Sequence, residues 1–300
     1  MTDPTAAHAS HMATELASQP DLWARAAGLT DLQALLPARG ERIAVVGCGT
    51  SWFMAQSYAI LRERAGHGET DAFAASEAPD ARDYDAIVAL TRSGTTTEVL
   101  QYVERARGRV KTIGVIGDAS SPLVPLVDEA VTLPFADEES VVQTRFATTA
   151  LALFRASLGE DLEQAVADAR TAVAEDLPPV LIDADQYSFL GLGWSYGLAQ
   201  EAALKMREAS QSWTEAYPSM EYRHGPLAIA APGRVTWQFG DAPEGLAGEV
   251  AATGAHFEQG RLDPLAELVR AQRVALARAV DRGLDPDRPR NLTRSVILDA

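Results

Sequence analysis

The sequence predicts an α/β protein with two doubly wound parallel sheets, each forming the middle layer of a three-layer αβα arrangement. Short apolar runs alternate with helical stretches along the chain, as in RIAVVG at 42–47 and AIVAL at 86–90. Such continuous apolar runs are typical of strands that are buried on both faces of a parallel sheet. In addition, one strand–turn–helix pattern occurs twice, which indicates two similar units.

The composition is that of an ordinary globular protein, and it limits the possible partners. The 300 residues include 42 acidic and 26 basic side chains, and the net charge of −16 repels nucleic acids and anionic membranes. Cys48 is the only cysteine, which excludes an intrachain disulfide and a cysteine-based zinc site. The chain has no apolar run of roughly 18 residues and no basic signal-peptide region. We therefore expect a cytoplasmic enzyme or ligand-binding protein without a metal or another cofactor.

The first half contains the elements of one such sheet. Residues 1–12 are small and polar, and we expect them to be mobile. Apolar residues at helical spacing between Leu16 and Leu29 predict an N-terminal helix. Strands and helices then alternate, with strands at 42–47, 86–90, 111–117 and 131–133 and helices at 52–64, around 99–103 and over 142–175.

A repeat with a constant offset of 144 residues marks the second half. Six residues of the first turn and helix recur, namely Gly47, Gly49, Ser51, Ala55, Gln56 and Ala59 as Gly191, Gly193, Ser195, Ala199, Gln200 and Ala203. We therefore predict an N-terminal helix and tail at 1–30, a first unit at 31–175 and a second unit at 176–300. In the second unit we expect a clear strand at 235–239, a loop at 241–263, a helix at 265–280 and a tail from 285 that docks back onto the fold.

The stretch TRSGTTTE at 91–98 follows a predicted strand and opens a helix. It supplies five hydroxyl groups, the guanidinium of Arg92 and the backbone N–H groups of a helix N-terminus, a combination that suits an anion. Helix capping explains one of these hydroxyls but does not explain five. We therefore predict a phosphate monoester site here. The neighbouring turn GCGTS at 47–51 lacks the third glycine of a dinucleotide fingerprint, and a tight strand–helix turn is its simpler interpretation.

The segment 191–226 carries the residues best suited to proton transfer. Glu201, Lys205 and Glu208 are spaced so that they share one helix face. A solvated ladder of charges is the commoner meaning of this spacing, but the surrounding helix is rich in Ala and Leu, which favours a buried polar site. His224 precedes Gly225 in a loop, where an imidazole titrates near neutrality, although a loop histidine is also common on an ordinary surface.

These stretches resemble the sugar isomerase (SIS) domain family, and most strongly the tandem-SIS isomerase half of glucosamine-6-phosphate synthases and stand-alone glucosamine-6-phosphate deaminases. The matching segments follow in order over nearly the whole chain: GCGTS, TRSGTTTE, GLGWSYGLAQEAALKMRE (191–208), EAYPSMEYRHGP (215–226) and PRNLTRSV (289–296). The resemblance implies two flavodoxin-like subdomains, the first binding phosphate and the second carrying catalysis. The glutaminase half of the synthases has no counterpart here, so we expect ammonia to be released or taken up free.

The resemblance also implies which residues hold the substrate. The residues matching the hexose 6-phosphate binders are Ser51, Thr91, Ser93 and Thr96. Arg92 stands where the synthases have glutamine, a change that we expect to strengthen an anion site. Val141 falls where the family offers backbone contacts to the sugar.

Three further residues correspond to the family's proton-transfer groups. Glu208 matches the base that moves a proton between C1 and C2 of the sugar, with Lys205 beside it. His224 matches the acid/base that opens the sugar ring and that a neighbouring subunit supplies. The resemblance therefore implies a homodimer with shared active sites, with neither nucleic acid nor membrane as a partner.

The chain departs from the family at Arg294, which aligns with the lysine that forms a Schiff base with a keto sugar. A guanidinium stays protonated and does not form this imine, so synthase chemistry on fructose 6-phosphate is not expected. Our first hypothesis is an isomerase/deaminase that converts glucosamine 6-phosphate to fructose 6-phosphate and ammonia. A lyase that eliminates the C3 hydroxyl of an N-acetylhexosamine 6-phosphate remains an alternative, and a non-catalytic sugar-phosphate sensor is a third.

Overall fold

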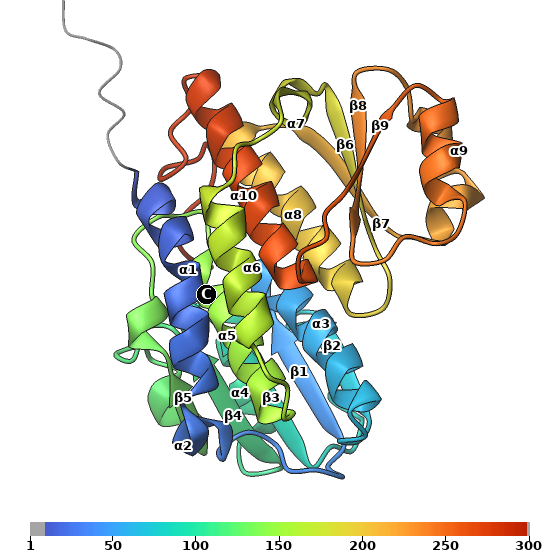
Figure 1. Ribbon diagram of the computed structural model, residues 1–300. Coiled ribbons are helices and arrows are strands. Elements are labelled where there is room, and N and C mark those ends of the chain that lie inside the picture. Colours follow the sequence, from blue (N-terminus) through green and yellow to red (C-terminus); the bar gives the residue numbers. More distant parts are fainter. Residues whose placement is uncertain (1–9, 299–300) are drawn as a thin grey trace, which may run out of the picture.

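The computed structural model describes residues 10–298 and contains two parallel sheets (Figure 1). The first sheet has the strand order β2-β1-β3-β4-β5 and the second has the order β7-β6-β8-β9, with every pair of neighbours parallel. The strands are β1 (Ile43–Gly47), β2 (Thr70–Ala74), β3 (Ala86–Thr91), β4 (Lys111–Ile116), β5 (Glu129–Thr132), β6 (Gln186–Gly191), β7 (Trp213–Pro218), β8 (Arg234–Phe239) and β9 (His256–Gln259). The predicted fold class is confirmed.

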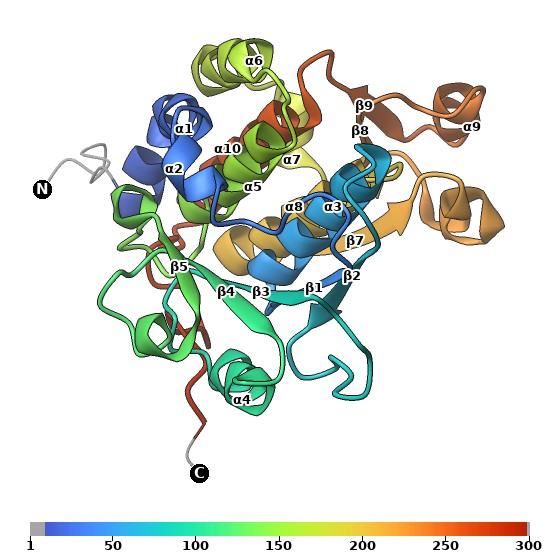
Figure 2. The same cartoon turned by 90° about the horizontal axis from the view of Figure 1, so that it is seen from below.

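Helices cover both faces of each sheet. They are α1 (His11–Ala27), α2 (Thr30–Gln33), α3 (Thr50–Arg64), α4 (Thr97–Ala106), α5 (Arg145–Ser157), α6 (Glu163–Ala174), α7 (Pro179–Asp183), α8 (Ser195–Ser210), α9 (Leu246–Ala252) and α10 (Pro264–Asp281). Short 3-10 turns are η1 (Val124–Leu126), η2 (Pro134–Ala136), η3 (Glu221–His224) and η4 (Pro226–Ile229). In Figure 2, α4 lies on one side of the first sheet, and α1, α3 and α5 lie on the other.

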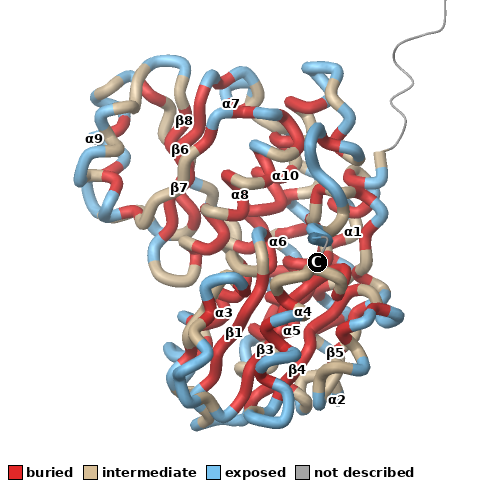
Figure 3. The backbone as a smooth tube through the Cα atoms, turned by 180° about the vertical axis from the view of Figure 1, so that it is seen from behind, coloured by how far each residue is buried: buried red, intermediate tan, exposed pale blue. Residues whose placement is uncertain are grey.

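The buried strands supply side chains to two different apolar clusters. Along β1, Ile43 and Val45 join a large cluster with α5, α8 and α10, whereas Ala44 and Val46 join a smaller cluster under α4. The large cluster also contains residues of β6 and β8, so it fills the space between the two sheets. The inner strands β1, β3, β4, β6 and β8 are accordingly buried along most of their length, as Figure 3 shows for β1, β3 and β4.

The predicted repeat is visible as two equivalent strand–turn–helix units, β1–α3 and β6–α8. A Cβ atom on Gly47 would lie 2.9 Å from Cβ of Ser51, and one on Gly191 would lie 2.4 Å from the carbonyl oxygen of Ser195. Both turns therefore require glycine for the same steric reason. The two helices pack against each other where Ser57 of α3 donates to the carbonyl oxygen of Trp194, 2.8 Å away.

Two predicted elements are corrected by the structure. The stretch 142–175 is not one helix, because the chain turns at Gly159, with φ of 84°, between α5 and α6. The stretch 241–263 is not only a loop, because it contains α9 and the edge strand β9. The edge strands β2 and β7 were not predicted either; most of their residues are only half-buried, so they lack a continuous apolar run.

The C-terminal segment, residues 285–298, docks onto the fold as predicted. Asp287 accepts hydrogen bonds from the backbone N–H groups of His11 and Met12, both at 2.8 Å. Farther on, Val296 accepts from the N–H of Thr97 at 3.2 Å. Most of the N-terminal stretch that we expected to be mobile, residues 1–9, lies outside the described residues, whereas His11 and Met12 begin α1. No helix within residues 10–298 is long and apolar enough to cross a lipid bilayer.

Candidate active site

A pocket of about 200 Å³ lies at the carboxyl ends of β1 and β3, the edge at which doubly wound sheets bind ligands. It brings together nine of the ten predicted site residues from both units and from the C-terminal segment; His224 is not among them. Its lining consists of 48–51, 90–93, Thr96, Val141, Gln143, Lys205, Glu208 and 292–296.

Four hydroxyl groups of this pocket have a proton available for a ligand. Those of Ser51, Thr91, Ser93 and Thr96 donate no hydrogen bond to any other group in residues 10–298. Thr91 and Ser93 only accept, from the backbone N–H groups of Gly94 and Thr95 respectively, each at 3.2 Å. Ser93 also accepts from the hydroxyl of Thr95, at 3.0 Å. Thr96 occupies the N-cap position of α4, but its side chain makes no capping bond. The capping interpretation therefore does not explain these hydroxyls, and the arrangement suits a phosphate.

The equivalent serine of the second unit is engaged within the protein. Ser195 donates from Oγ to the carbonyl oxygen of Phe239, 2.9 Å away, and accepts from the N–H of Leu192 at 3.0 Å. Ser51, at the equivalent position of the first unit, makes no such bonds in the described part of the chain. Of these two serines, only Ser51 has a hydroxyl proton that no group within residues 10–298 accepts.

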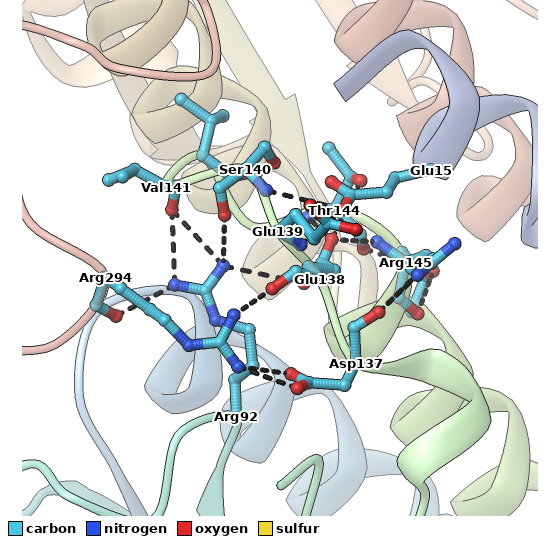
Figure 4. A network of polar contacts seen from close by, with 12 residues as sticks. Glu15, Arg92, Asp137, Glu138, Glu139, Ser140, Val141, Thr144, Arg145 and Arg294 are labelled. Atoms are coloured by element: carbon cyan, nitrogen blue, oxygen red, sulfur yellow. Dashed lines mark hydrogen bonds and ion pairs between the residues drawn. The ribbon is translucent and has the colours of Figure 1, made fainter. Parts of the chain in front are cut away.

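Arg92 lies in the wall of the pocket with its guanidinium directed at backbone carbonyl groups. Nη1 donates to the carbonyl of Ser140 at 2.9 Å, and both Nη1 and Nη2 donate to that of Val141 at 3.3 Å. Nη2 also donates to the carbonyl of Arg294 at 2.8 Å. Since four donor contacts are used on the protein, the guanidinium holds three parts of the wall together (Figure 4).

Glu138 lies behind this wall, beside Arg92, and is a residue that sequence reasoning missed. Its side chain is fully buried, and Oε1 accepts from the N–H groups of Thr144 and Arg145 at 2.5 and 2.7 Å, at the start of α5. Oε2 lies 3.7 Å from Nη1 of Arg92. Burial raises the pKa of the Glu138 carboxyl, while the charge of Arg92 opposes this shift. No local motif marks this residue, because its partners come from several segments.

Lys205 and Glu208 form the charged floor of the pocket. The ammonium of Lys205 is completely buried; it contacts Oε2 of Glu208 and lies 3.5 Å from Oε1 of Glu201. Burial lowers the pKa of Lys205, but the charges of Glu201 and Glu208 outweigh this effect and raise it overall. The three residues share one helix face as predicted, and they are buried rather than a solvated ladder.

Burial distinguishes the two carboxyl partners of Lys205. Burial raises the pKa of the Glu201 carboxyl to about 8, while the charge of Lys205 opposes this shift. Glu208 is the less buried of the two partners, and it lines the pocket. A carboxylate at the pocket surface is suited to accept a proton from a bound molecule.

Arg294 is bound by the loop that follows η2. Its guanidinium donates to both carboxylate oxygens of Asp137, at 2.6 and 2.8 Å, and to the backbone carbonyl of Glu138.

Burial raises the pKa of the Cys48 thiol, the only thiol of the pocket, to about 11, so it is not a thiolate at neutral pH. The geometry thus offers hydroxyl donors, one carboxylate and one ammonium as reacting or binding groups.

His224 lies away from the pocket, at the end of η3, and is exposed. Its neighbour Arg223 pairs with Glu249 at 2.8 Å, on the outer side of the second unit. His224 is therefore not among the residues that line the pocket with Lys205 and Glu208.

The fold and the pocket define a two-sheet α/β protein with a hydroxyl-rich, anion-type site at the carboxyl ends of its first sheet. Residues 36–158 match the family model described as the SIS domain. This match spans the first sheet of the chain, from β1 through α5.

Relatives with curated sequences are similar over most of this chain. The glutamine–fructose-6-phosphate aminotransferase (isomerizing) of Aeropyrum pernix is 29% identical over 96% of this chain and 57% of its own length. The protein of the same name from a Nostoc species is 28% identical over 86% of this chain and 52% of its own length. The chain thus spans about half the length of the curated relatives it matches.

Solved structures resemble the whole fold. A glucosamine-6-phosphate deaminase from Thermotoga maritima superposes with a TM-score of 0.83 and 26% identity, covering 96% of this chain and 100% of that one. The tagatose-6-phosphate ketose/aldose isomerase of Escherichia coli has a TM-score of 0.78 and 20% identity, over 94% and 96% of the two chains. The latter similarity shows the fold alone.

Proposed function

We propose that the protein is a sugar-phosphate isomerase/deaminase that converts glucosamine 6-phosphate and water to fructose 6-phosphate and ammonia. The observation that carries this proposal is the buried Lys205–Glu208 pair, which lies in the same pocket as four hydroxyls with free protons. The similarity to relatives whose names include sugar-phosphate isomerisation and deamination supports the same class of substrate.

In this mechanism the first unit, 31–175, holds the phosphate and the second, 176–300, moves the proton. Ser51, Thr91, Ser93 and Thr96 donate to the phosphate oxygens. The backbone at Val141 contacts the sugar, whose ring is first opened by His224 of a second copy of the chain. The homodimer belongs to the proposal because His224 is exposed and does not line the pocket of its own chain.

Glu208 then removes the proton from C2, which the C1 aldehyde makes acidic. Lys205 stabilises the negative charge that develops on the sugar oxygen. Return of the proton to C1 leaves an imine at C2, and addition of water to this imine expels ammonia. No lysine at position 294 is needed, because the substrate already carries its nitrogen, and the guanidinium of Arg294 is committed to Asp137.

The decisive experiment is incubation of the full chain with glucosamine 6-phosphate and, separately, with its N-acetyl derivative. We expect stoichiometric ammonia and fructose 6-phosphate from the first substrate only. An unsaturated-sugar chromophore from the N-acetyl derivative, without ammonia from either, would identify the lyase instead. Tight binding of both sugars without turnover of either would identify a sensor and would contradict the assignment of Glu208 as a base.

A further inference from the structure

Two residues that line the pocket, Arg92 and Arg294, form a closed ring of contacts with the buried Glu138. Arg92 donates to the backbone carbonyl of Arg294, and the guanidinium of Arg294 donates to the backbone carbonyl of Glu138. The carboxylate of Glu138 faces Arg92 at 3.7 Å. Figure 4 shows this ring, with the carboxylate of Asp137 as an additional acceptor for Arg294. We call Arg92, Glu138 and Arg294 the wall ring.

The wall ring joins parts of the chain that are far apart in sequence. Arg92 and Arg294 are 202 positions apart, and Arg92 and Ser140 are 48 apart. Glu138 in turn accepts from the N–H groups of Thr144 and Arg145, which fixes the ring to the start of α5. The ring therefore connects the hydroxyl loop before α4, the loop before α5 and the C-terminal segment, and all three line the same pocket.

The charges of the wall ring are poorly explained by stability alone. The side chains of Arg92 and Glu138 are 5% and 0% exposed, and burial of such a pair loses hydration that its own attraction often fails to recover. Nε of Arg92 and Oε2 of Glu138 also remain without a hydrogen-bond partner among the described residues. Polar groups that are buried beside a pocket at such a cost in free energy indicate a role in shaping the pocket.

We propose that the wall ring consists of positioning residues, which hold the C-terminal segment as a wall of the pocket beside Lys205 and Glu208. Arg92 and Glu138 act through the backbone they bind, and Arg294 acts as a clamp on the loop 137–138. The ring keeps residues 292–296 against the hydroxyl loop, where the hydroxyl groups of Thr95 and Ser295 are hydrogen-bonded at 2.8 Å. This inference deepens the proposed function and rests on it only for the activity measurement described below.

The first test needs no substrate and measures hydrogen exchange of the C-terminal segment and of residues 93–100 in the full chain. Arg294→Lys keeps the positive charge but loses the planar fork that grips Asp137 and Glu138. Arg92→Gln loses the guanidinium contacts to Ser140, Val141 and Arg294. We expect each substitution to speed exchange at least about tenfold, which corresponds to a loss of one such set of contacts.

The double variant Arg92→Gln/Arg294→Lys distinguishes a ring from two independent contacts. In a ring, either change already frees the segment, so the double variant should exchange no more than about twice as fast as the faster single variant. If the exchange rate of the double variant increases by the product of the two single increases, the proposal is wrong. It is also wrong if exchange is unchanged in both single variants. Arg288→Lys is the matched control, since Arg288 lies exposed in the same segment and its side chain makes no bond within residues 10–298.

Activity provides the second measurement. We expect Arg294→Lys to raise the KM for glucosamine 6-phosphate about tenfold while kcat changes less, because the reacting groups Lys205 and Glu208 are unaltered. If Arg92→Gln does not fold, Arg294→Lys still tests the ring, because Arg294 is 35% exposed and its replacement leaves no buried cavity. If exchange responds as expected but the unmodified protein turns over neither sugar, the proposed function is wrong and the wall ring stands.

Discussion

The ammonium of Lys205 lies 3.5 Å from Oε1 of Glu201, one helical turn away, and both side chains are about 99% buried. Glu208 is the second carboxyl partner of the same ammonium and is more exposed, at 19%. The ammonium of Lys205 is thus the partner of two carboxyl groups that differ in burial. Burial raises the pKa of Glu201, the more buried of the two acids, to about 8.

Replacement of Glu208 by Gln should remove the base and leave the pocket shape unchanged. We expect kcat for glucosamine 6-phosphate to fall by about 10²–10⁴, with little change in binding of the sugar phosphate. Solvent-deuterium incorporation at C2 should fall in parallel with ammonia release. Glu104→Gln is the control, because Glu104 is exposed on α4. Full turnover by Glu208→Gln would show that another group removes the proton.

Glu201 should make the stability of the protein depend on pH. Its pKa is raised from 4.5 to about 8 in the folded protein, so the folded state keeps a proton that the unfolded chain releases between these values. This contribution to the free energy of unfolding is present below about pH 4.5 and is lost as pH rises toward 8. The slope approaches about 1.4 kcal/mol per pH unit.

Urea unfolding of the parent protein and of Glu201→Gln from pH 5 to pH 8 measures this contribution. The glutamine variant should lose less stability over the range than the parent, because its amide does not titrate. Parallel curves for the two proteins would mean that Glu201 is already ionised at pH 5 in the folded state.

The two turns of the repeat provide a matched pair of serines. Ser51→Ala should weaken binding of a hexosamine 6-phosphate by about 10–100-fold, since it removes one hydrogen bond to a charged group. Ser195→Ala should leave binding unchanged and destabilise the fold by about 1–3 kcal/mol, because the carbonyl of Phe239 loses its donor. Calorimetric titration and thermal unfolding of both variants separate the two effects. The opposite pattern would assign the ligand to the second unit.

His224 can be tested by complementation between subunits. His224→Ala and Glu208→Gln should each be inactive alone, yet a mixed dimer of the two contains one intact site if His224 is supplied by the partner. Unfolding and refolding an equal mixture should then restore about a quarter of the parental activity. The refolded single variants serve as controls. Mixed dimers without activity would show that His224 acts in its own chain or not at all.

The predictable parts of the site are those whose residues lie close together in the sequence. The hydroxyl loop at 91–97 and the face of Glu201, Lys205 and Glu208 depend on local spacing, so their sequence patterns were sufficient. The repeat at an offset of 144 likewise predicted that a second sheet exists. In the hydroxyl loop and on the helix face, the geometry of a single strand end or a single helix determines where the side chains lie.

The other parts depend on contacts between distant segments. Glu138 and Arg92 lie side by side although they are 46 positions apart in the sequence (138 − 92), and no motif surrounds Glu138. Edge strands such as β7 were missed because WTEAYP mixes exposed and half-buried residues, since only one side of the strand has a neighbour in the sheet. The expectation that Arg92 strengthens an anion site overlooked the carbonyl groups that the fold brings to its guanidinium.

Residues 292–296 form one side of the pocket, and Asp287 binds the start of α1. Both sheets and α10 are complete before residue 285, so they do not include this side of the pocket. A chain cut at residue 284 would therefore keep every strand and lose one wall of the pocket. We expect its circular dichroism to resemble that of the full chain while its affinity for a hexosamine 6-phosphate falls.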